Sequence, residues 1–172
     1  KKKRDGGMWY TSEVKDYEYH TGNVDDAPTM RAKQLASIMR MKALQTYVSK
    51  EKYTKQLMSI IKDKCIIFAN TQKQADKICD YSYHSKNKNS DNNLELFSNG
   101  TIDKLSCVLQ LSEGVSIPGL RSGIIMHAYG NERKSAQRIG RLLRLNPNET
   151  AMCHILCYKN TIDEQWVKKA LA

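Results

Sequence analysis

The sequence predicts an α/β fold with a mostly parallel sheet and helices on both of its faces. Short apolar segments of strand length alternate with segments of helical periodicity along most of the chain. The first such segment, KCIIFAN at 64–70, contains a continuous apolar run, as strands buried on both faces do. A helix start signal follows it at once. This alternation is typical of parallel sheets with helical crossovers.

Residues 1–28 are expected to form a linker or a partly ordered basic arm. They mix charged residues, glycine and aromatic residues without a sustained period, and they end in DDAP. KKKR at 1–4 is interpreted as a frayed basic end, although a phosphate-binding patch or a localisation signal is the alternative. Residues 29–172 are expected to form one domain.

Two amphipathic helices are predicted ahead of the first strand, over residues 30–48 and 50–62. In each helix the apolar residues recur at helical spacing, and we expect them to face the core. In the first helix they are Leu35, Ile38, Met39, Ala43, Leu44, Tyr47 and Val48. In the second they are Tyr53, Leu57, Ile60 and Ile61.

Five segments are predicted strands: 64–70, 81–84, 104–111, 122–129 and 151–158. The helices after them begin at Thr71, where Thr71 and Gln74 form a capping box, and at residue 91, with Gly100 closing that helix. Two further helices are predicted at 132–145 and after Thr161, where Glu164 completes the cap and Trp166, Val167 and Leu171 follow. Ligands bind at the carboxyl ends of parallel strands, so the loops after Phe68, Leu109 and Met126 are the expected site.

The composition favours a polyanionic partner. Lys and Arg number 28 against 18 Asp and Glu, a net charge of +10, and nucleic acid is the commonest polyanion, although the charge can also serve solubility alone. No apolar run is long enough to span a membrane, and none follows the basic start, so we expect a cytoplasmic protein without a membrane partner. The five cysteines are expected to be buried, reduced thiols. Cys153 and Cys157 would lie about 13 Å apart in a strand, so no metal site is expected there.

The predicted helix at 132–145 carries a polar face suited to phosphate. Gln137, Arg141 and Arg144 fall within about 60° of one another, opposite three apolar residues, Ile139, Leu142 and Leu143. Gly140 lies at the edge of the polar face, where the missing side chain lets a ligand or another backbone approach. Each guanidinium can donate two parallel hydrogen bonds to phosphate oxygens. A solvated amphipathic helix is the alternative interpretation.

A second candidate segment is LSEGVSIPGL at 111–120, which follows a predicted strand. It places Ser112, Glu113 and Gly114 at a turn, where backbone N–H groups can hold a phosphate. A plain loop between strand and helix is the alternative.

CIIFANT, LQLSEGVSIPGL and QRIGRLLRLNP, in this order and at these separations, closely resemble motifs IV, V and VI of superfamily 2 helicases. These motifs belong to the second RecA-like domain of the helicase core, and the resemblance covers residues 39–169. It is nearer to phage DNA-repair helicases and restriction-enzyme motor subunits than to DEAD-box RNA helicases, whose motif VI usually begins with histidine. The resemblance implies a RecA-like lobe of the P-loop NTPase type.

In that family two RecA-like lobes hold ATP and Mg²⁺ between them. The resemblance implies that Arg141 and Arg144 are arginine fingers for the γ-phosphate and that Gln137 senses the nucleotide. It implies contacts on the nucleotide side for Gly114, Glu113 and Gly140. It implies nucleic-acid phosphate contacts for Asn70, Thr71, Lys86 and Ser112.

The chain departs from the family pattern in two ways. Ser116 stands where motif V often has aspartate, and the threonine frequent at the end of the preceding strand has no clear counterpart at 107–110. No G-x-x-x-x-G-K-[ST] or acidic Walker B strand occurs. We therefore expect an upstream lobe to bind most of ATP and Mg²⁺, and this chain to be inactive alone. The start at Lys1 without methionine suggests a piece of a longer polypeptide.

The sequence thus predicts the C-terminal motor lobe of an ATP-dependent nucleic-acid helicase or translocase, acting on DNA in preference to RNA. The alternative is a non-catalytic nucleic-acid-binding module with a RecA-like fold. An unrelated dinucleotide-binding domain is disfavoured because no G-x-G-x-x-G follows any predicted strand.

Overall fold

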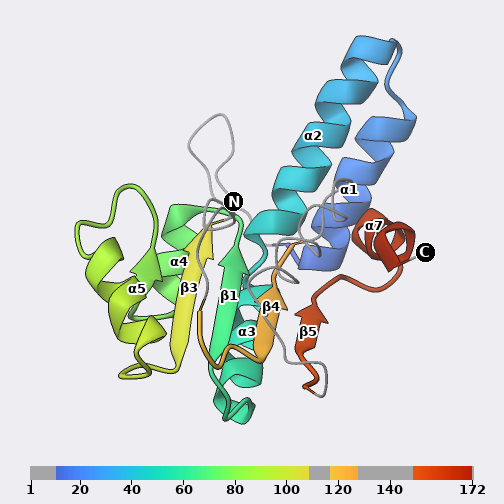
Figure 1. Cartoon of the computed structure of the whole chain (residues 1–172). Coiled ribbons are helices and arrows are strands. Elements are labelled where there is room, and N and C mark those ends of the chain that lie inside the picture. Colours follow the sequence, from blue (N-terminus) through green and yellow to red (C-terminus); the bar gives the residue numbers. More distant parts are fainter. Residues whose placement is uncertain (1–10, 109–116, 128–148, 172) are drawn as a thin grey trace. The chain divides into compact units, whose positions relative to one another are not determined.

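The computed structural model describes residues 11–108, 117–127 and 149–171 (Figure 1). The chain divides into two compact units, Lys1–Tyr47 and Val48–Ala172. Among the described residues, no helix combines the length and the apolar character needed to cross a membrane.

The first unit contains a pair of packed helices, α1 (Glu13–Asp25) and α2 (Met30–Thr46). Each begins at a hydroxyl cap: Ser12 Oγ accepts from the Lys15 amide, and Thr29 Oγ1 accepts from the Ala32 amide, both at 3.2 Å. Helix α1 lies within the segment 1–28 for which we expected no regular element. Its buried positions are Asp16 and Val24, so its inner face has no apolar period from which a helix could be predicted.

The expected core face of α2 is largely wrong. Leu35, Ile38 and Met39 are exposed, whereas Ala43, Leu44 and Tyr47 are buried as expected. In the part of the first unit that the structure describes, residues 11–47, α1 is the one helix that packs on α2, and a shorter helix leaves part of the apolar stripe of its neighbour exposed. The same expectation fails at Val48 and, in the second helix, at Tyr53 and Ile60, which are exposed as well.

The second unit is built on a five-stranded sheet with the order β2-β3-β1-β4-β5 (Figure 1). All four neighbouring pairs are parallel, as predicted. The strands are β1 (Cys65–Ala69), β2 (Ser82–Tyr83), β3 (Lys104–Val108), β4 (Ser122–Ile125) and β5 (Met152–Ile155). Strand β1 is shorter than its predicted segment 64–70, because Lys64 and Asn70 lie outside it. On β5 and just after it, Cys153 and Cys157 are exposed and not buried as expected.

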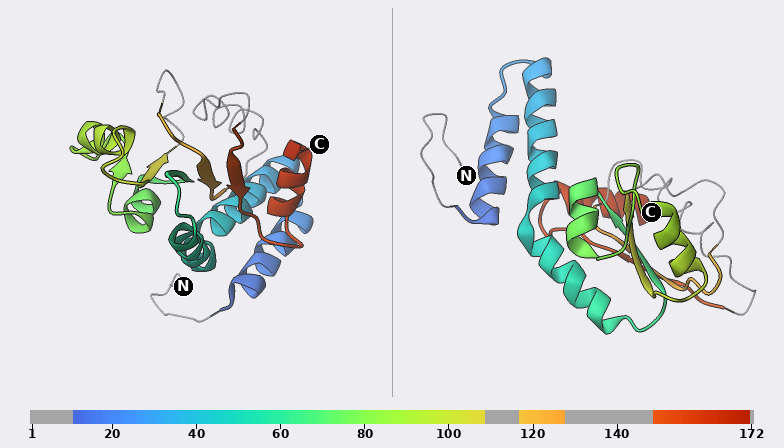
Figure 2. Two further views of the ribbon diagram at one scale, coloured as in Figure 1. Left: turned by 60° about the horizontal axis from the view of Figure 1, so that its bottom comes forward. Right: turned by 90° about the vertical axis from the view of Figure 1, so that its left-hand side faces the viewer.

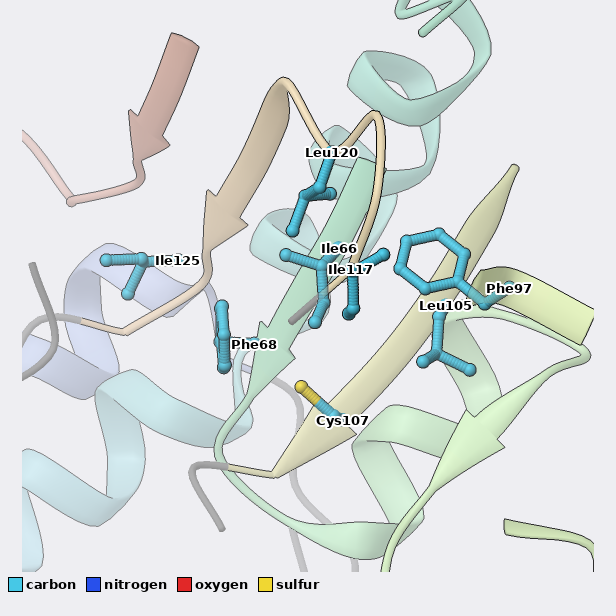
Figure 3. Close-up of a cluster of buried hydrophobic side chains, with 8 residues drawn as sticks. All are labelled: Ile66, Phe68, Phe97, Leu105, Cys107, Ile117, Leu120 and Ile125. Atoms are coloured by element: carbon cyan, nitrogen blue, oxygen red, sulfur yellow. The ribbon is translucent and has the colours of Figure 1, made fainter. Parts of the chain in front are cut away.

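The helices among the described residues of this unit are α3 (Val48–Ile60), α4 (Gln72–Ile78), α5 (Ser90–Ser98) and α7 (Ile162–Leu171). Alternate residues of each central strand point to opposite faces of the sheet. On one face, Cys65, Ile67 and Ile124 pack with side chains of α4 and of the second half of α3. On the other face, Ile66, Phe68 and Leu105 pack with Phe97 of α5 (Figure 3). Helices therefore cover both faces, as expected (Figure 2).

Two predicted helix boundaries are confirmed in atomic detail. Thr71 Oγ1 accepts a hydrogen bond of 3.2 Å from the Gln74 amide at the start of α4. After α5, Gly100 has a φ of +84°, a left-handed conformation that glycine adopts without steric cost. The Thr71 cap fixes the loop between β1 and α4, and Gly100 fixes the loop between α5 and β3.

Candidate nucleic-acid interface

The site is built where the central strand β1 and its neighbour β4 end side by side. Phe68 pairs with Ile125, and the Met126 amide extends the ladder with a hydrogen bond of 3.0 Å to the Phe68 carbonyl. The residues that follow, Asn70 on one side and His127 on the other, therefore lie at the same carboxyl edge of the sheet. This is the edge at which the sequence predicts ligand binding.

The loop after β1 carries two of the predicted nucleic-acid residues. The Asn70 amide donates to Gln74 Oε1 at 2.9 Å, and Gln74 is only 4% exposed. Thr71 is exposed, and while its oxygen caps α4 its hydroxyl can still donate a hydrogen to a phosphate oxygen. The buried Gln74 side chain thus anchors this loop, and the exposed Thr71 hydroxyl is available as a donor to solvent.

A third predicted residue, Lys86, is brought to the same edge. Gln72 Nε2, next to Thr71, donates to Ser85 Oγ at 3.1 Å and so ties the start of α4 to the loop after β2. Lys86 follows Ser85 directly and is exposed. A hydroxyl and an ammonium group therefore come from two adjacent loops, an arrangement typical of contacts with a sugar–phosphate backbone.

A polar network supports the loop that carries Lys86. Asp76 Oδ1 accepts from Ser82 Oγ at 2.6 Å and lies 2.8 Å from Nε2 of the buried His84. Hydrogen bonds from His84 and then from Ser82 lower the pKa of Asp76, so this carboxyl stays an acceptor. Asn87 donates to the Ser82 carbonyl at 3.0 Å, which closes the loop on β2.

His127 is a functional candidate that the sequence did not reveal. It is 6% exposed, and its Nε2 lies 3.1 Å from Gln74 Oε1. Burial, with a smaller contribution from the charge of Lys50, lowers the pKa of His127 to about 3, so its imidazole is neutral near pH 7. Its position directly after an apolar strand was the one available signal, since polar residues there belong to the binding edge.

Gln74 plays a different part from the one its capping box predicts. Its side chain accepts from the amide of Asn70, one residue before the cap Thr71, and also contacts His127. The helix start is therefore predicted correctly, but the second half of the box is used to join two strand ends.

The remaining predicted site residues lie outside the described residues. They are Ser112, Glu113 and Gly114 in segment 109–116, and Gln137, Gly140, Arg141 and Arg144 in segment 128–148, with the helix expected at 132–145. The structure brings together Asn70, Thr71 and Lys86 and leaves these others as predictions.

A second polar cluster lies at the carboxyl end of β5. Lys50 Nζ contacts Asp163 Oδ2 at 2.6 Å, and it lies 4.7 Å from the centre of the Tyr158 ring. Burial lowers the pKa of Lys50 although the Asp163 carboxylate opposes this shift. Beside it is a pocket of about 660 Å³ between α3 and residues 155–158. Lys50 Nζ also donates to the Leu156 carbonyl, and Asp163 Oδ2 accepts from the Tyr158 amide, so we interpret the pair as structural.

Comparisons with known proteins agree with this architecture. The family model described as helicase conserved C-terminal domain matches residues 49–146. A DNA 3'-5' translocase, XPB2 of Sulfurisphaera tokodaii, is 27% identical over 119 residues, which are 66% of this chain and 27% of that protein. The chain thus spans about a quarter of the length of this relative.

Two solved structures share the fold. The C-terminal domain of the DEAD-box protein Dbp5 superposes with a TM-score of 0.59 at 17% identity, covering 73% of this chain and 78% of that domain. The SWI2/SNF2 ATPase core of Sulfolobus solfataricus, solved in complex with dsDNA, gives a TM-score of 0.66 at 13% identity, covering 92% of this chain and 40% of that one. The parallel sheet with helices on both faces is therefore that of the RecA-like C-terminal lobes of helicases.

Proposed function

Because the chain belongs to the family of the helicase conserved C-terminal domain, the second RecA-like domain of superfamily 2 helicases and translocases, we propose that it works as a C-terminal motor lobe. In this proposal the lobe binds nucleic acid at the carboxyl edge of its sheet. It also completes an ATP site whose larger part belongs to an upstream lobe. The observation that carries the proposal is the juxtaposition of Asn70, Thr71 and Lys86 through the Gln72–Ser85 hydrogen bond.

The nucleic-acid part rests on charge and on the donors of this edge. Thr71 and Lys86 are exposed and come from adjacent loops, and the whole chain carries a net charge of +10. Contacts of this kind go to phosphates and are sequence-independent. DNA is proposed in preference to RNA, supported by the name of the translocase relative and by the duplex DNA in the SWI2/SNF2 complex. Ser112 is proposed as a further phosphate contact.

The ATP part rests on the motif VI pattern. Arg141 and Arg144 are proposed as arginine fingers that stabilise the charge developing on the γ-phosphate, with Gln137 sensing the nucleotide. Gly114, Glu113 and Gly140 are proposed on the nucleotide side. ATP and Mg²⁺ would be held mainly by the upstream lobe, since the chain has no Walker A sequence.

The test uses the intact polypeptide that contains this chain. ATP hydrolysis is measured without nucleic acid and with single-stranded DNA, duplex DNA and RNA. Arg141→Ala and Arg144→Ala should each lower the stimulated rate by about 10³-fold, the magnitude at the low end for arginine fingers. Arg121→Ala is the matched control, because Arg121 precedes β4 at the opposite edge and loses only a partly exposed ion pair with Glu149.

Three outcomes separate the alternatives. Loss of stimulated hydrolysis with retained folding and DNA binding supports the motor lobe. Unfolding of both arginine variants would instead assign these side chains a structural role. DNA binding by the intact polypeptide without any stimulated hydrolysis would favour a non-catalytic binding module. The 172-residue chain alone should bind DNA in a salt-dependent manner and hydrolyse no ATP.

A further inference from the structure

The side-chain carboxamide of Gln74 joins two strand ends that are distant in sequence. Its Oε1 lies 2.9 Å from the Asn70 amide, after β1, and 3.1 Å from His127 Nε2, after β4. Gln74 and His127 are 4% and 6% exposed, so the contact between their side chains is buried, while the contact with the Asn70 amide is partly buried. A buried oxygen shared by two donors fixes the distance between the two chain segments.

The chemistry of these contacts defines the protonation of His127. A backbone N–H can only donate, so the atom of Gln74 that faces Asn70 must be the oxygen. The imidazole nitrogen that faces the same oxygen must therefore carry a hydrogen. Burial keeps the pKa of His127 at about 3, and the ring is consequently neutral with its single hydrogen on Nε2. The contact is thus one defined hydrogen bond across the whole physiological pH range.

The two joined segments lead to different predicted functions. Asn70 opens the loop that carries Thr71, where nucleic-acid contact is proposed. His127 immediately precedes residues 128–148, which contain Arg141 and Arg144. We propose that Gln74 and His127 are positioning residues that hold the Asn70–Thr71 loop in a fixed relation to the end of β4 and so couple nucleic-acid binding to ATP turnover. This inference rests on the function proposed above.

Coupling of this kind needs a rigid connection, because two loops that move independently cannot report on each other. The β1–β4 ladder supplies one connection up to the Met126 amide. Beyond the Met126 amide, the Gln74 carboxamide extends this connection. It contacts Asn70 after β1 and His127 after β4. Removing its oxygen, or the donor on His127, should loosen the loop while the strands below stay paired.

The experiment compares three variants in the intact polypeptide. Gln74→Met keeps the length of the side chain without the acceptor, and His127→Leu removes the donor. His127→Gln keeps an N–H donor at a similar reach. The readout is the ratio of DNA-stimulated to basal ATP hydrolysis, together with the DNA concentration for half-maximal stimulation. His154→Leu on β5 and Gln34→Met on α2 are matched controls outside the site.

We expect the ratio to fall about ten-fold or more in Gln74→Met and His127→Leu, because small misplacements of catalytic groups have effects of this size. His127→Gln should restore it to within about three-fold of the wild type. In the 172-residue chain, amide exchange of Asn70 should be about ten-fold faster in His127→Leu and close to normal in His127→Gln.

The results separate the two proposals. Stimulation that is present in the wild type and unchanged in both disruptive variants would overturn the positioning role alone. Equal loss in His127→Leu and His127→Gln would also overturn it, because the shape of the ring and not its hydrogen bond would then matter. A wild type without any stimulation would overturn the proposed function, and the coupling with it. If Gln74→Met fails to fold, the His127 pair decides by itself.

Discussion

Lys50 and Asp163 form an ion pair of 2.6 Å in which each side chain is only 3% exposed. Asp163 Oδ2 also accepts a hydrogen bond of 3.1 Å from the Tyr158 amide. The pair thus connects the start of α3 with the start of α7 and with the loop after β5. Buried charges of this kind are costly to separate, although forming them contributes little net stability.

Removing one partner should therefore be strongly destabilising. Lys50→Met preserves most of the side-chain volume but leaves the Asp163 carboxylate buried without its counterion. We expect a loss of about 3 to 5 kcal/mol in the free energy of unfolding, measured by urea titration of the chain. Lys52→Met, two residues along the same helix and exposed, should change it by less than about 0.5 kcal/mol. Equal effects of the two substitutions would contradict this interpretation.

His127 should make stability depend on pH between about 3 and 6.5. Its pKa is about 3 in the folded chain against an ordinary value of 6.5, so in this window the unfolded chain binds the extra proton. The contribution of His127 to the free energy of unfolding is then fully present above pH 6.5, and it declines as the pH falls toward 3. One pKa unit corresponds to about 1.4 kcal/mol, so the decline attributable to His127 is roughly 4 to 5 kcal/mol.

The substitution His127→Gln isolates this contribution, since glutamine does not titrate. Urea unfolding at a series of pH values from 4 to 7.5 should give a flatter curve for the variant than for the wild type. Parallel curves would mean that the pKa of His127 is the same in the folded and the unfolded chain.

Thr71 allows the structural and the functional role of one residue to be separated. Thr71→Ala removes the cap of α4 and should cost about 1 kcal/mol. Thr71→Asp keeps a good cap, because its carboxylate can accept from the Gln74 amide, but it directs negative charge at the proposed phosphate contact. Thermal unfolding should be near that of the wild type for Thr71→Asp, while DNA binding, measured by fluorescence anisotropy, should weaken. Unchanged binding would remove Thr71 from the interface.

Lys86 should contribute one phosphate contact. Lys86→Ala is expected to weaken binding about equally for DNA of any sequence and to reduce the slope of log affinity against log salt by about 1. Lys62→Ala serves as the control, because Lys62 is also exposed but precedes β1 and so lies toward the opposite edge of the sheet. Titrations at several salt concentrations give both slopes. A slope that is unchanged in Lys86→Ala would place the interface elsewhere.

The sheet was predictable because its signals are local. The apolar run at Cys65–Ala69 is buried throughout, and Thr71 and Gly100 mark helix boundaries by chemistry that a single residue carries. Helix α1 was not predictable, since it buries the carboxylate of Asp16, which accepts a hydrogen bond of 3.0 Å from the distant Tyr47 hydroxyl. Only the tertiary partner makes such a residue acceptable inside.

The positions of three candidate residues were predictable in the same limited sense. Asn70, Thr71 and Lys86 were selected as candidates through a resemblance in motif order, and their placement at one edge follows from parallel strands that end there. Gln74 and His127 were missed in this role because a hydrogen bond between residues 53 positions apart leaves no periodic or spacing signal in one sequence. Leu35 and Ile38 failed in the opposite way. Their helical spacing correctly indicates that they share one face of a helix, but it does not show whether another element packs on that face.

The central place of β1 has a consequence for biosynthesis. Its two hydrogen-bonded neighbours, β3 and β4, are both encoded downstream, with Cys65 paired to Lys104 and to Ser122. In a nascent chain the apolar segment CIIFA therefore has unpaired backbone groups along both of its edges until Lys104 leaves the ribosome. One edge stays unpaired until Ser122 has followed. Over that interval this strand is where chaperones would be needed most.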